Sequence, residues 1–85
     1  MTDFLRFIEE LVQRFPIHVE ITYNKTFDWR IYVYKRGCAS DYPDSLNDGC
    51  GNAILCSEQD CDIELCFAKA HVAVKEWLCE HEGGY

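Results

Sequence analysis

The spacing of the apolar residues changes at Pro16, and this change limits the folds that the chain can adopt. Over residues 3–15, apolar side chains recur with the 3.6-residue period of an amphipathic helix. Thr2 is placed to cap this helix, and Pro16 ends it because proline disfavours a helical conformation in the preceding residue. Residues 17–23 alternate strictly between apolar and polar, which predicts a strand. Its inward side chains are Ile17, Val19, Ile21 and Tyr23.

Two more strands are predicted further along the chain. Residues 24–26 form a hairpin connection to a second strand, residues 27–36, which also alternates between a buried and a polar side. Residues 37–52 are rich in Gly, Pro, Ser, Asn and Asp and are therefore expected to form an acidic loop. Residues 53–56 complete the sheet as a short strand. The buried side of the second strand carries Trp29, Ile31 and Val33.

A long helix is predicted at the end of the chain. Ser57 is expected to cap it, because Asp60, three residues later, occupies the capping-box position. The helix should run to about Glu82, with Gly83 placed to stop it and residues 83–85 left as a flexible tail.

The order helix, three strands, helix indicates an α+β fold. Both helices are expected to cover one face of a three-stranded antiparallel sheet and to leave the other face open. The 85 residues should form one compact domain, 1–85, because a chain of this length has no room for a second.

The final helix carries two apolar stripes on different sides. The broad stripe is expected to be the core face, and it comprises Ile63, Cys66, Phe67, Ala70, Ala73, Val74, Trp77 and Leu78. The narrow stripe comprises Cys61, Leu65, Ala68, Val72 and Cys79. Either the first helix packs on the narrow stripe, or Leu65, Ala68 and Val72 form a seam for a second copy or another partner.

Charge is divided unevenly along the chain. Residues 1–36 contain six Lys/Arg and five Asp/Glu, whereas residues 37–85 contain two and ten. Acidic residues at the start of a helix stabilise its dipole, but aspartates clustered in a loop repel one another. The cluster therefore serves either solubility alone or the binding of a basic partner. Its candidate contact residues are Asp41, Asp44, Asp48, Asp60, Asp62 and Glu64.

The open face of the predicted sheet is a second candidate surface. It should carry Arg30, Tyr32, Tyr34 and Arg36. Aromatic residues between arginines on a bare sheet are typical of single-stranded RNA binding, and the element order matches double-stranded RNA-binding domains. A net charge of −7 disfavours both, because phosphate contacts supply most of the affinity for nucleic acid. The four residues form either a plain solvent-facing surface or a protein contact.

No residue pattern indicates a metal, a cofactor or catalysis. The spacings of the six cysteines include no Cys-x2-Cys pair of the kind that structural zinc sites use. None of His18, His71 and His81 has a sequence neighbour that would make it a general base. We therefore expect no enzyme activity, and the sequence leaves open whether the thiols are free, disulfide-bonded or metal-bound.

In length, order of elements and acidity, the chain resembles the small acidic proteins of phages and mobile elements, the anti-CRISPR proteins above all. One inhibitor of that kind has the same helix–three strands–helix order. It presents carboxylates where the arginines and lysines of a nuclease would read the target duplex. The resemblance implies a phage-encoded DNA mimic that occupies the basic groove of a nucleic-acid-processing protein, such as a CRISPR nuclease.

Taken together, these patterns predict a non-catalytic inhibitor or adaptor that binds another protein and does not bind nucleic acid directly. The alternative is a small homodimeric structural or regulatory protein that associates through the seam on its final helix. No segment has the features of a signal peptide or a membrane span, so we expect a cytoplasmic protein.

Overall fold

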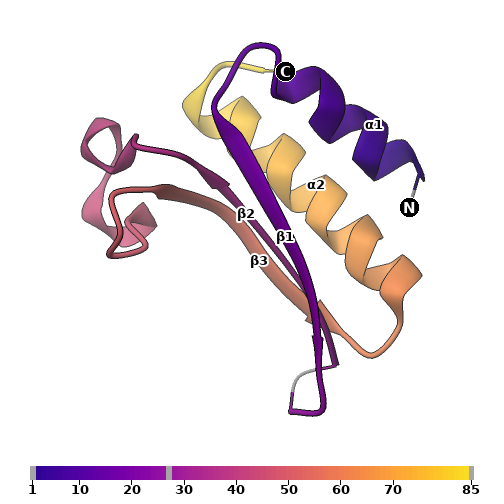
Figure 1. Ribbon diagram of the computed structural model, residues 1–85. Helices are drawn as coiled ribbons and strands as arrows, with labels where there is room; N and C mark the ends of the chain where they lie inside the picture. The colour runs from indigo at the N-terminus through magenta and orange to yellow at the C-terminus, as the bar shows by residue number, and fades with distance from the viewer. Residues whose placement is uncertain (1, 27, 85) are drawn as a thin grey trace.

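A computed structural model describes residues 2–26 and 28–84 and confirms the predicted helix–three-stranded antiparallel sheet–helix order (Figure 1). Two positions named in the predictions from the sequence lie outside the described residues: Phe27, the first residue of the second strand, and Tyr85, the end of the tail. The helices are α1 (Thr2–Leu11) and α2 (Ile63–His81). The strands are β1 (Ile17–Asn24), β2 (Asp28–Lys35) and β3 (Ala53–Asp60). Two short 3-10 turns, η1 (Ala39–Asp41) and η2 (Asp44–Leu46), lie in the loop before β3.

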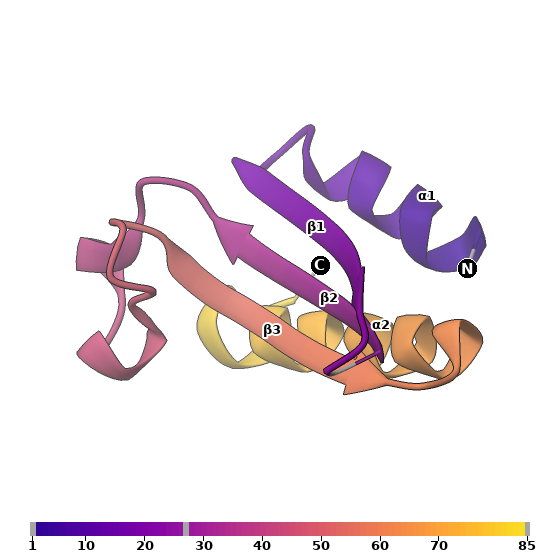
Figure 2. The same ribbon diagram turned by 60° about the horizontal axis from the view of Figure 1, so that its bottom comes forward.

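The sheet has the order β1-β2-β3, and both neighbouring pairs are antiparallel. Figure 1 shows α1 and α2 on the same side of the sheet, and in Figure 2 α2 passes behind β2 and β3 while α1 lies toward β1. The register of β1 against β2 is uninterrupted from Ile17 opposite Lys35 to Asn24 opposite Asp28. The helices therefore cover one face of the sheet and leave the other open.

The core lies between the covered face of the sheet and the two helices. The central strand contributes Ile31 and Val33, and α1 contributes Phe4 and Leu11, all of them buried. The broad stripe of α2 is the core face, as predicted, with Ile63 and Ala73 only partly buried. Its buried members are Cys66, Phe67, Ala70, Val74, Trp77 and Leu78.

The first helix is shorter than predicted and ends at Leu11 instead of residue 15. Arg14 and Phe15 both donate backbone hydrogen bonds to the Leu11 carbonyl, each at 2.9 Å, so the chain turns there. Pro16 has no N–H to donate and disfavours a helical backbone at Phe15. The helical hydrogen bonds therefore end before Pro16. The second strand also ends one residue earlier than predicted, so Arg36 lies beyond β2.

The third strand is longer and the second helix begins later than predicted. Ser57 pairs with Tyr32 inside β3 instead of capping a helix, and β3 continues to Asp60. The cap of α2 is Asp62, whose carboxylate accepts hydrogen bonds from the backbone N–H of Glu64 (2.9 Å) and Leu65 (3.4 Å). Pairing with a neighbouring strand thus outweighs the local capping signal at Ser57.

β3 contains a β-bulge at Leu55. Tyr34 pairs with Ile54 and Val33 pairs with Cys56, so Leu55 is the extra residue between them. Leu55 and Cys56 are consequently both buried although they are consecutive. Beyond the bulge, the side chains that share the covered face are those of Cys56, Glu58 and Asp60, of which the last two pair with Ile31 and Trp29.

α1 does not cover the narrow stripe of α2. Phe4 packs against Phe67, with ring centroids 5.4 Å apart, and Phe7 packs against His71 at 4.9 Å. The expectation that the first helix leans on the narrow stripe is therefore wrong. Leu65 and Val72 stay 51% and 57% exposed.

The far half of β1 is uncovered as well. α1 and β1 diverge from the turn that joins them, in both views of the ribbon (Figures 1 and 2). Ile21 and Tyr23 lie on the covered side of the sheet, opposite Ile31 and Trp29, as their alternation predicts. They are nevertheless 41% and 62% exposed, so the prediction that they are buried is wrong.

Candidate functional site

The open face of the sheet brings nine side chains of three strands together. The alternation of β1 and β2 and their register place His18 beside Tyr34, Glu20 beside Tyr32, and Thr22 beside Arg30. β3 adds a row on the other side of β2, comprising Ile54, Ser57 and Gln59. Of the four residues that the sequence assigned to this face, Arg30, Tyr32 and Tyr34 lie within it.

A row of aromatic rings in contact, each tilted against the next, crosses this face. The ring centroids of His18 and Tyr34 lie 4.8 Å apart, and those of Tyr34 and Tyr32 lie 5.1 Å apart. The guanidinium carbon of Arg30 lies 5.7 Å from the Tyr32 ring, within the range of a cation–π contact. Next to the row is a shallow hollow of about 170 Å³, lined by Glu20, Thr22, Arg30 and Tyr32. The face therefore offers aromatic rings that accept a cationic side chain.

Asp48 connects the acidic loop to this aromatic row. The Tyr32 hydroxyl donates a hydrogen bond to Asp48 Oδ2 at 3.2 Å. Burial, followed by this hydrogen bond and the charge of Asp48, raises the pKa of Tyr32 to about 12. The Asn52 side chain (2.9 Å) and the Cys50 N–H (2.7 Å) donate to the same carboxylate and hold the pKa of Asp48 below its usual range. Asp48 thus fixes the loop against the open face.

The structure splits the predicted acidic surface into two parts. Asp41 and Asp44 lie exposed in η1 and η2, at the end of the sheet where β3 begins. Asp60, Asp62 and Glu64 lie where β3 meets α2, and the two ribbon views show this junction at the other end of the sheet from the loop (Figures 1 and 2). The eight residues of β3 separate the two parts by roughly 25 Å. The six carboxylates therefore do not form one patch.

Two carboxylates of the second part have structural roles. Asp60 accepts a hydrogen bond from the Asp62 N–H (2.9 Å) and pairs with Lys69 Nζ (3.3 Å), and these contacts hold its pKa below the usual range. Asp62 caps α2. Glu64 is exposed in the first turn of the helix, where a carboxylate is favoured by the dipole. The presence of these three carboxylates is therefore explained by their stabilising effect on the β3–α2 connection and on the start of α2.

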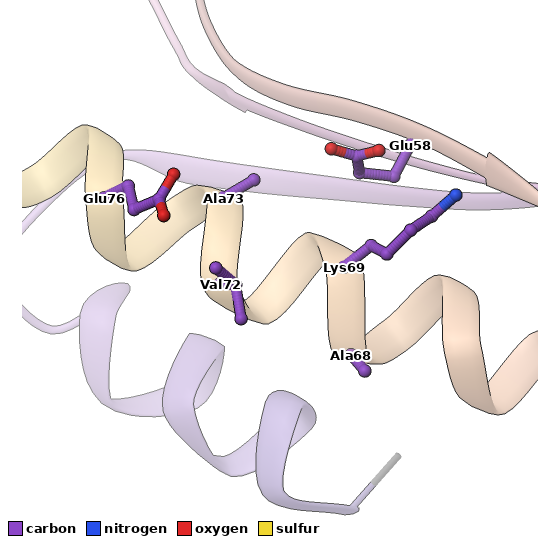
Figure 3. Close-up of a pocket in the computed structure, with 6 residues that line it drawn as sticks. All are labelled: Glu58, Ala68, Lys69, Val72, Ala73 and Glu76. Carbon is purple, nitrogen blue, oxygen red and sulfur yellow. The ribbon is translucent and has the colours of Figure 1, made fainter.

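The narrow stripe of α2 borders a shallow hollow whose lining is mainly apolar. The hollow measures about 370 Å³ and lies between the helix and β3 (Figure 3). Lys69 extends from α2 toward Glu58, while Ala68 and Val72 point away from the sheet (Figure 3). The seam that the sequence predicted, Leu65, Ala68 and Val72, is therefore exposed and open to contact.

A polar cluster that was not predicted from the sequence lies at the opposite end of α2. Lys35 Nζ donates hydrogen bonds to the Tyr42 hydroxyl (2.7 Å) and to Glu82 Oε1 (3.1 Å), and the Tyr42 hydroxyl donates to Glu82 as well. Burial lowers the pKa of Lys35, but the bonds to Tyr42 and Glu82 raise it by more. The sequence does contain one indication of this cluster. The alternation of the second strand puts Lys35 on its buried side, and a buried charge needs hydrogen-bonding partners.

The thiols offer no activated nucleophile in the core. Burial raises the pKa of Cys56 to about 12, and burial also raises the pKa of Cys66. Both thiols are therefore protonated and unreactive at neutral pH. All six cysteines are free. Within residues 2–26 and 28–84, no three His, Cys, Asp or Glu side chains are arranged to hold a metal ion.

Neither helix of the described chain is long and apolar enough to cross a membrane. No protein-family model, no curated protein and no solved structure matches the chain.

Proposed function

We propose that this chain is a non-catalytic inhibitor or adaptor that binds a partner protein through the open face of its sheet. The observation that carries the proposal is the row of His18, Tyr34 and Tyr32 on a face that neither helix covers. Rings that already contact one another lose little side-chain entropy on binding, and tyrosine is enriched in the centres of protein interfaces.

The proposed partner surface is rich in arginine and lysine. Tyr32 already has the Arg30 guanidinium against its ring, so the same face has the chemistry to accept a cationic side chain from outside. At the loop end of this face, Asp41 and Asp44 are exposed and add negative charge. A basic surface that normally binds nucleic acid meets these requirements. In its narrowest form the proposal is an anti-CRISPR-type inhibitor that keeps DNA from a nuclease.

The split of the acidic residues changes how such an inhibitor would work. The loop aspartates and the open face form the contact in this proposal, while Asp60 and Asp62 hold the β3–α2 connection. The site then combines aromatic stacking with a charged margin and does not imitate a continuous row of phosphates. Charge at the margin of an interface acts mainly on the rate of association and on its salt dependence.

The test compares two variants that lose the same charge at different places. Asp41→Asn with Asp44→Asn removes two charges beside the open face, and Glu9→Gln with Glu10→Gln removes two from the exposed side of α1. Capture of a DNA-binding protein from a bacterial lysate, with elution by a short DNA duplex, should fall about tenfold for the loop variant. The α1 variant should capture as the unmodified chain does. Equal losses would mean that net charge alone drives capture and would contradict the proposed site.

A second candidate function is the homodimeric regulatory protein. It is favoured by the exposure of Leu65 and Val72, which α1 leaves uncovered. In that case charge changes in the loop would have no effect on the captured material, and Leu65→Glu would convert a dimer of twice the 9.9 kDa mass into a folded monomer.

A further inference from the structure

The two edges of the sheet differ in whether they can accept another strand. At the β3 edge, Leu55 forms a bulge, and Glu58 and Asp60 place charges on the covered side. The first residue of β3, Ala53, also forms a bridge with Asn47 of the loop. Bulges, inward charges and loops over an edge are the features by which proteins prevent edge-to-edge pairing.

The β1 edge, as far as the structure describes it, has none of these features. Its register against β2 runs without a bulge, and the side chains of β1 on the covered side are Ile17, Val19, Ile21 and Tyr23. Arg36 N–H donates to the Pro16 carbonyl at 2.8 Å. Because hydrogen-bonded pairs alternate along an antiparallel ladder, this bond identifies which residues of β1 are hydrogen-bonded to β2. Even-numbered residues of β1 therefore bond to β2, and the odd-numbered ones direct N–H and C=O to the free edge.

Apolar surface gathers on the same side of the molecule. Ile21 and Tyr23 are 41% and 62% exposed on β1. Leu5 of α1 and Val12, in the turn directly after it, are seven residues apart, share one flank and are also exposed. Phe7 and its neighbours occupy the other flank, beside α2. Of the six exposed large apolar side chains among the described residues, four therefore lie along the β1 side and two on α2.

We propose that a second copy of this chain pairs with the free edge of β1. The strands pair antiparallel about a twofold axis at Ile21, which sets Ile21 against its own copy and Val19 against Tyr23 on the covered side. On the open side, Glu20 then faces Thr22. If the two β1 strands paired with the twofold axis at Glu20, the Glu20 carboxylates of the two copies would lie directly opposite each other. That register is therefore disfavoured.

Charge also places the second copy at β1. Residues 17–26 contain one carboxylate and one lysine, Glu20 and Lys25, so this edge carries no net charge. The narrow stripe of α2, in contrast, has a border with a net negative charge that a twofold contact would bring together. This border contains two lysines, Lys69 and Lys75, and five carboxylates, which are Asp62, Glu64, Glu76, Glu80 and Glu82. In a molecule with a net charge of −7, the neutral edge is the favourable place for a copy to approach.

The product is a six-stranded sheet with both pairs of helices on one side. The twofold axis is perpendicular to the sheet, so the open faces of the two copies join into one surface. This inference is independent of the partner proposed above, since pairing uses the backbone of β1 and its covered side.

The first experiment needs no mutation. The amides of Val19, Ile21 and Tyr23 point to the free edge, so their hydrogen exchange should slow by about tenfold or more as the protein concentration rises about a hundredfold. The amides of His18, Glu20 and Thr22 bond to β2 and serve as internal controls that are protected at every concentration. Light scattering over the same range should show the mass rising to twice 9.9 kDa.

A pair of variants then locates the contact. Ile21→Lys changes an exposed residue and should return the mass to 9.9 kDa with an unchanged circular dichroism spectrum. Val72→Lys, on the exposed narrow stripe of α2, should leave the dimer intact. If Ile21→Lys does not fold, the hydrogen exchange of the unmodified chain decides the question.

Three results would overturn the inference. One is a mass of 9.9 kDa at every concentration with fast exchange at the edge amides. Another is a dimer that Val72→Lys dissociates and Ile21→Lys does not. The third is protection of the edge amides that appears only when a different protein is added, because the occupant of the edge is then a strand of that protein.

Discussion

Lys35 occupies an inward-facing position of the central strand, and its two partners come from distant parts of the chain. Tyr42 belongs to the loop after η1, and Glu82 is the last residue before the C-terminal glycines. The cluster thus fixes the loop and the end of α2 to the same strand. The rings of Phe15 and Tyr42 lie 5.0 and 5.2 Å from the Lys35 ammonium, which strengthens the arrangement.

Glu82→Gln should lower the free energy of unfolding by about 1.5 kcal/mol at neutral pH, because a charge-assisted hydrogen bond is lost. Hydrogen bonds from Tyr42 and Lys35 hold the pKa of Glu82 below its ordinary value of 4.5 in the folded protein. The stabilisation is therefore present above that value and is lost as the pH falls through the folded pKa. Urea unfolding at neutral and at strongly acidic pH measures both effects. If the free energies of unfolding of Glu82→Gln and the unmodified protein differed by the same amount at both pH values, the ionised Glu82 carboxylate would not be the source of the stabilisation.

Asp48→Asn should lower the pKa of Tyr32 from about 12 toward its ordinary value of 10.0. The substitution removes the charge that disfavours the tyrosinate, while burial, the largest cause of the shift, remains. Ultraviolet absorbance of tyrosinate, followed through an alkaline titration, reports the change. Asp44→Asn removes a charge from the same loop and serves as a control that should leave Tyr32 unaffected. An unaltered titration in Asp48→Asn would mean that the loop does not contact the open face.

At the scale of elements, the connection between β3 and α2 is the part of the fold where local signals and tertiary contacts disagree. Ser57 and Asp60 have the spacing of a capping box, yet both belong to a strand. The pairs Ser57–Tyr32 and Asp60–Trp29 extend the ladder of β2, and Lys69 pairs with Asp60 across the covered side.

Asp62→Ala should destabilise the protein by about 1 kcal/mol, because the N–H groups of Glu64 and Leu65 lose their acceptor. Ser57→Ala, at the position that the sequence favours as the cap, should change stability by less than about 0.5 kcal/mol. Thermal or denaturant unfolding of the two variants compares them directly. The reverse order of effects would place the start of the helix at Ser57.

The order of the elements was predictable because the periods of 3.6 and 2 are local properties of the sequence. The same alternation placed Arg30, Tyr32 and Tyr34 on the open face. The boundary of α2 was not predictable, since it depends on strand pairing with β2.

The division of the acidic residues was also beyond the sequence, because it follows from the true length of β3. A strand of four residues would have left the two groups close together, whereas the eight residues observed keep them apart. The contact of Asp48 with Tyr32 joins residues 16 positions apart through an irregular loop, and no period of the sequence reports it.

At the scale of the whole molecule, stability depends on one thin core. The chain has 85 residues, and domains of this size are stable by only about 5 kcal/mol. Trp77 is the largest buried side chain of α2, and it contacts Tyr42 and His81 with ring centroids 5.0 and 4.7 Å away.

Trp77→Ala should therefore lose about 3–5 kcal/mol, comparable to the total stability. Circular dichroism at room temperature should show a largely unfolded population. Val72→Ala, on the exposed side of the same helix, should change stability by less than about 0.5 kcal/mol. A cooperative, well-folded Trp77→Ala protein would show that the core extends beyond the side chains named above.

The bulge at Leu55 also affects which genetic changes the gene can tolerate. In most strands, losing one codon inverts every later side chain and exchanges the core with the surface. Deleting Leu55 would not invert the later side chains. Ile54 and Cys56, on either side of it, already pair with the adjacent residues Tyr34 and Val33. Deleting this codon would keep every other residue of β3 paired with the same residue of β2, and the core would lose one buried leucine. The same deletion at Ser57 would exchange the faces of the strand, so neighbouring codons of one strand differ sharply in their tolerance of loss.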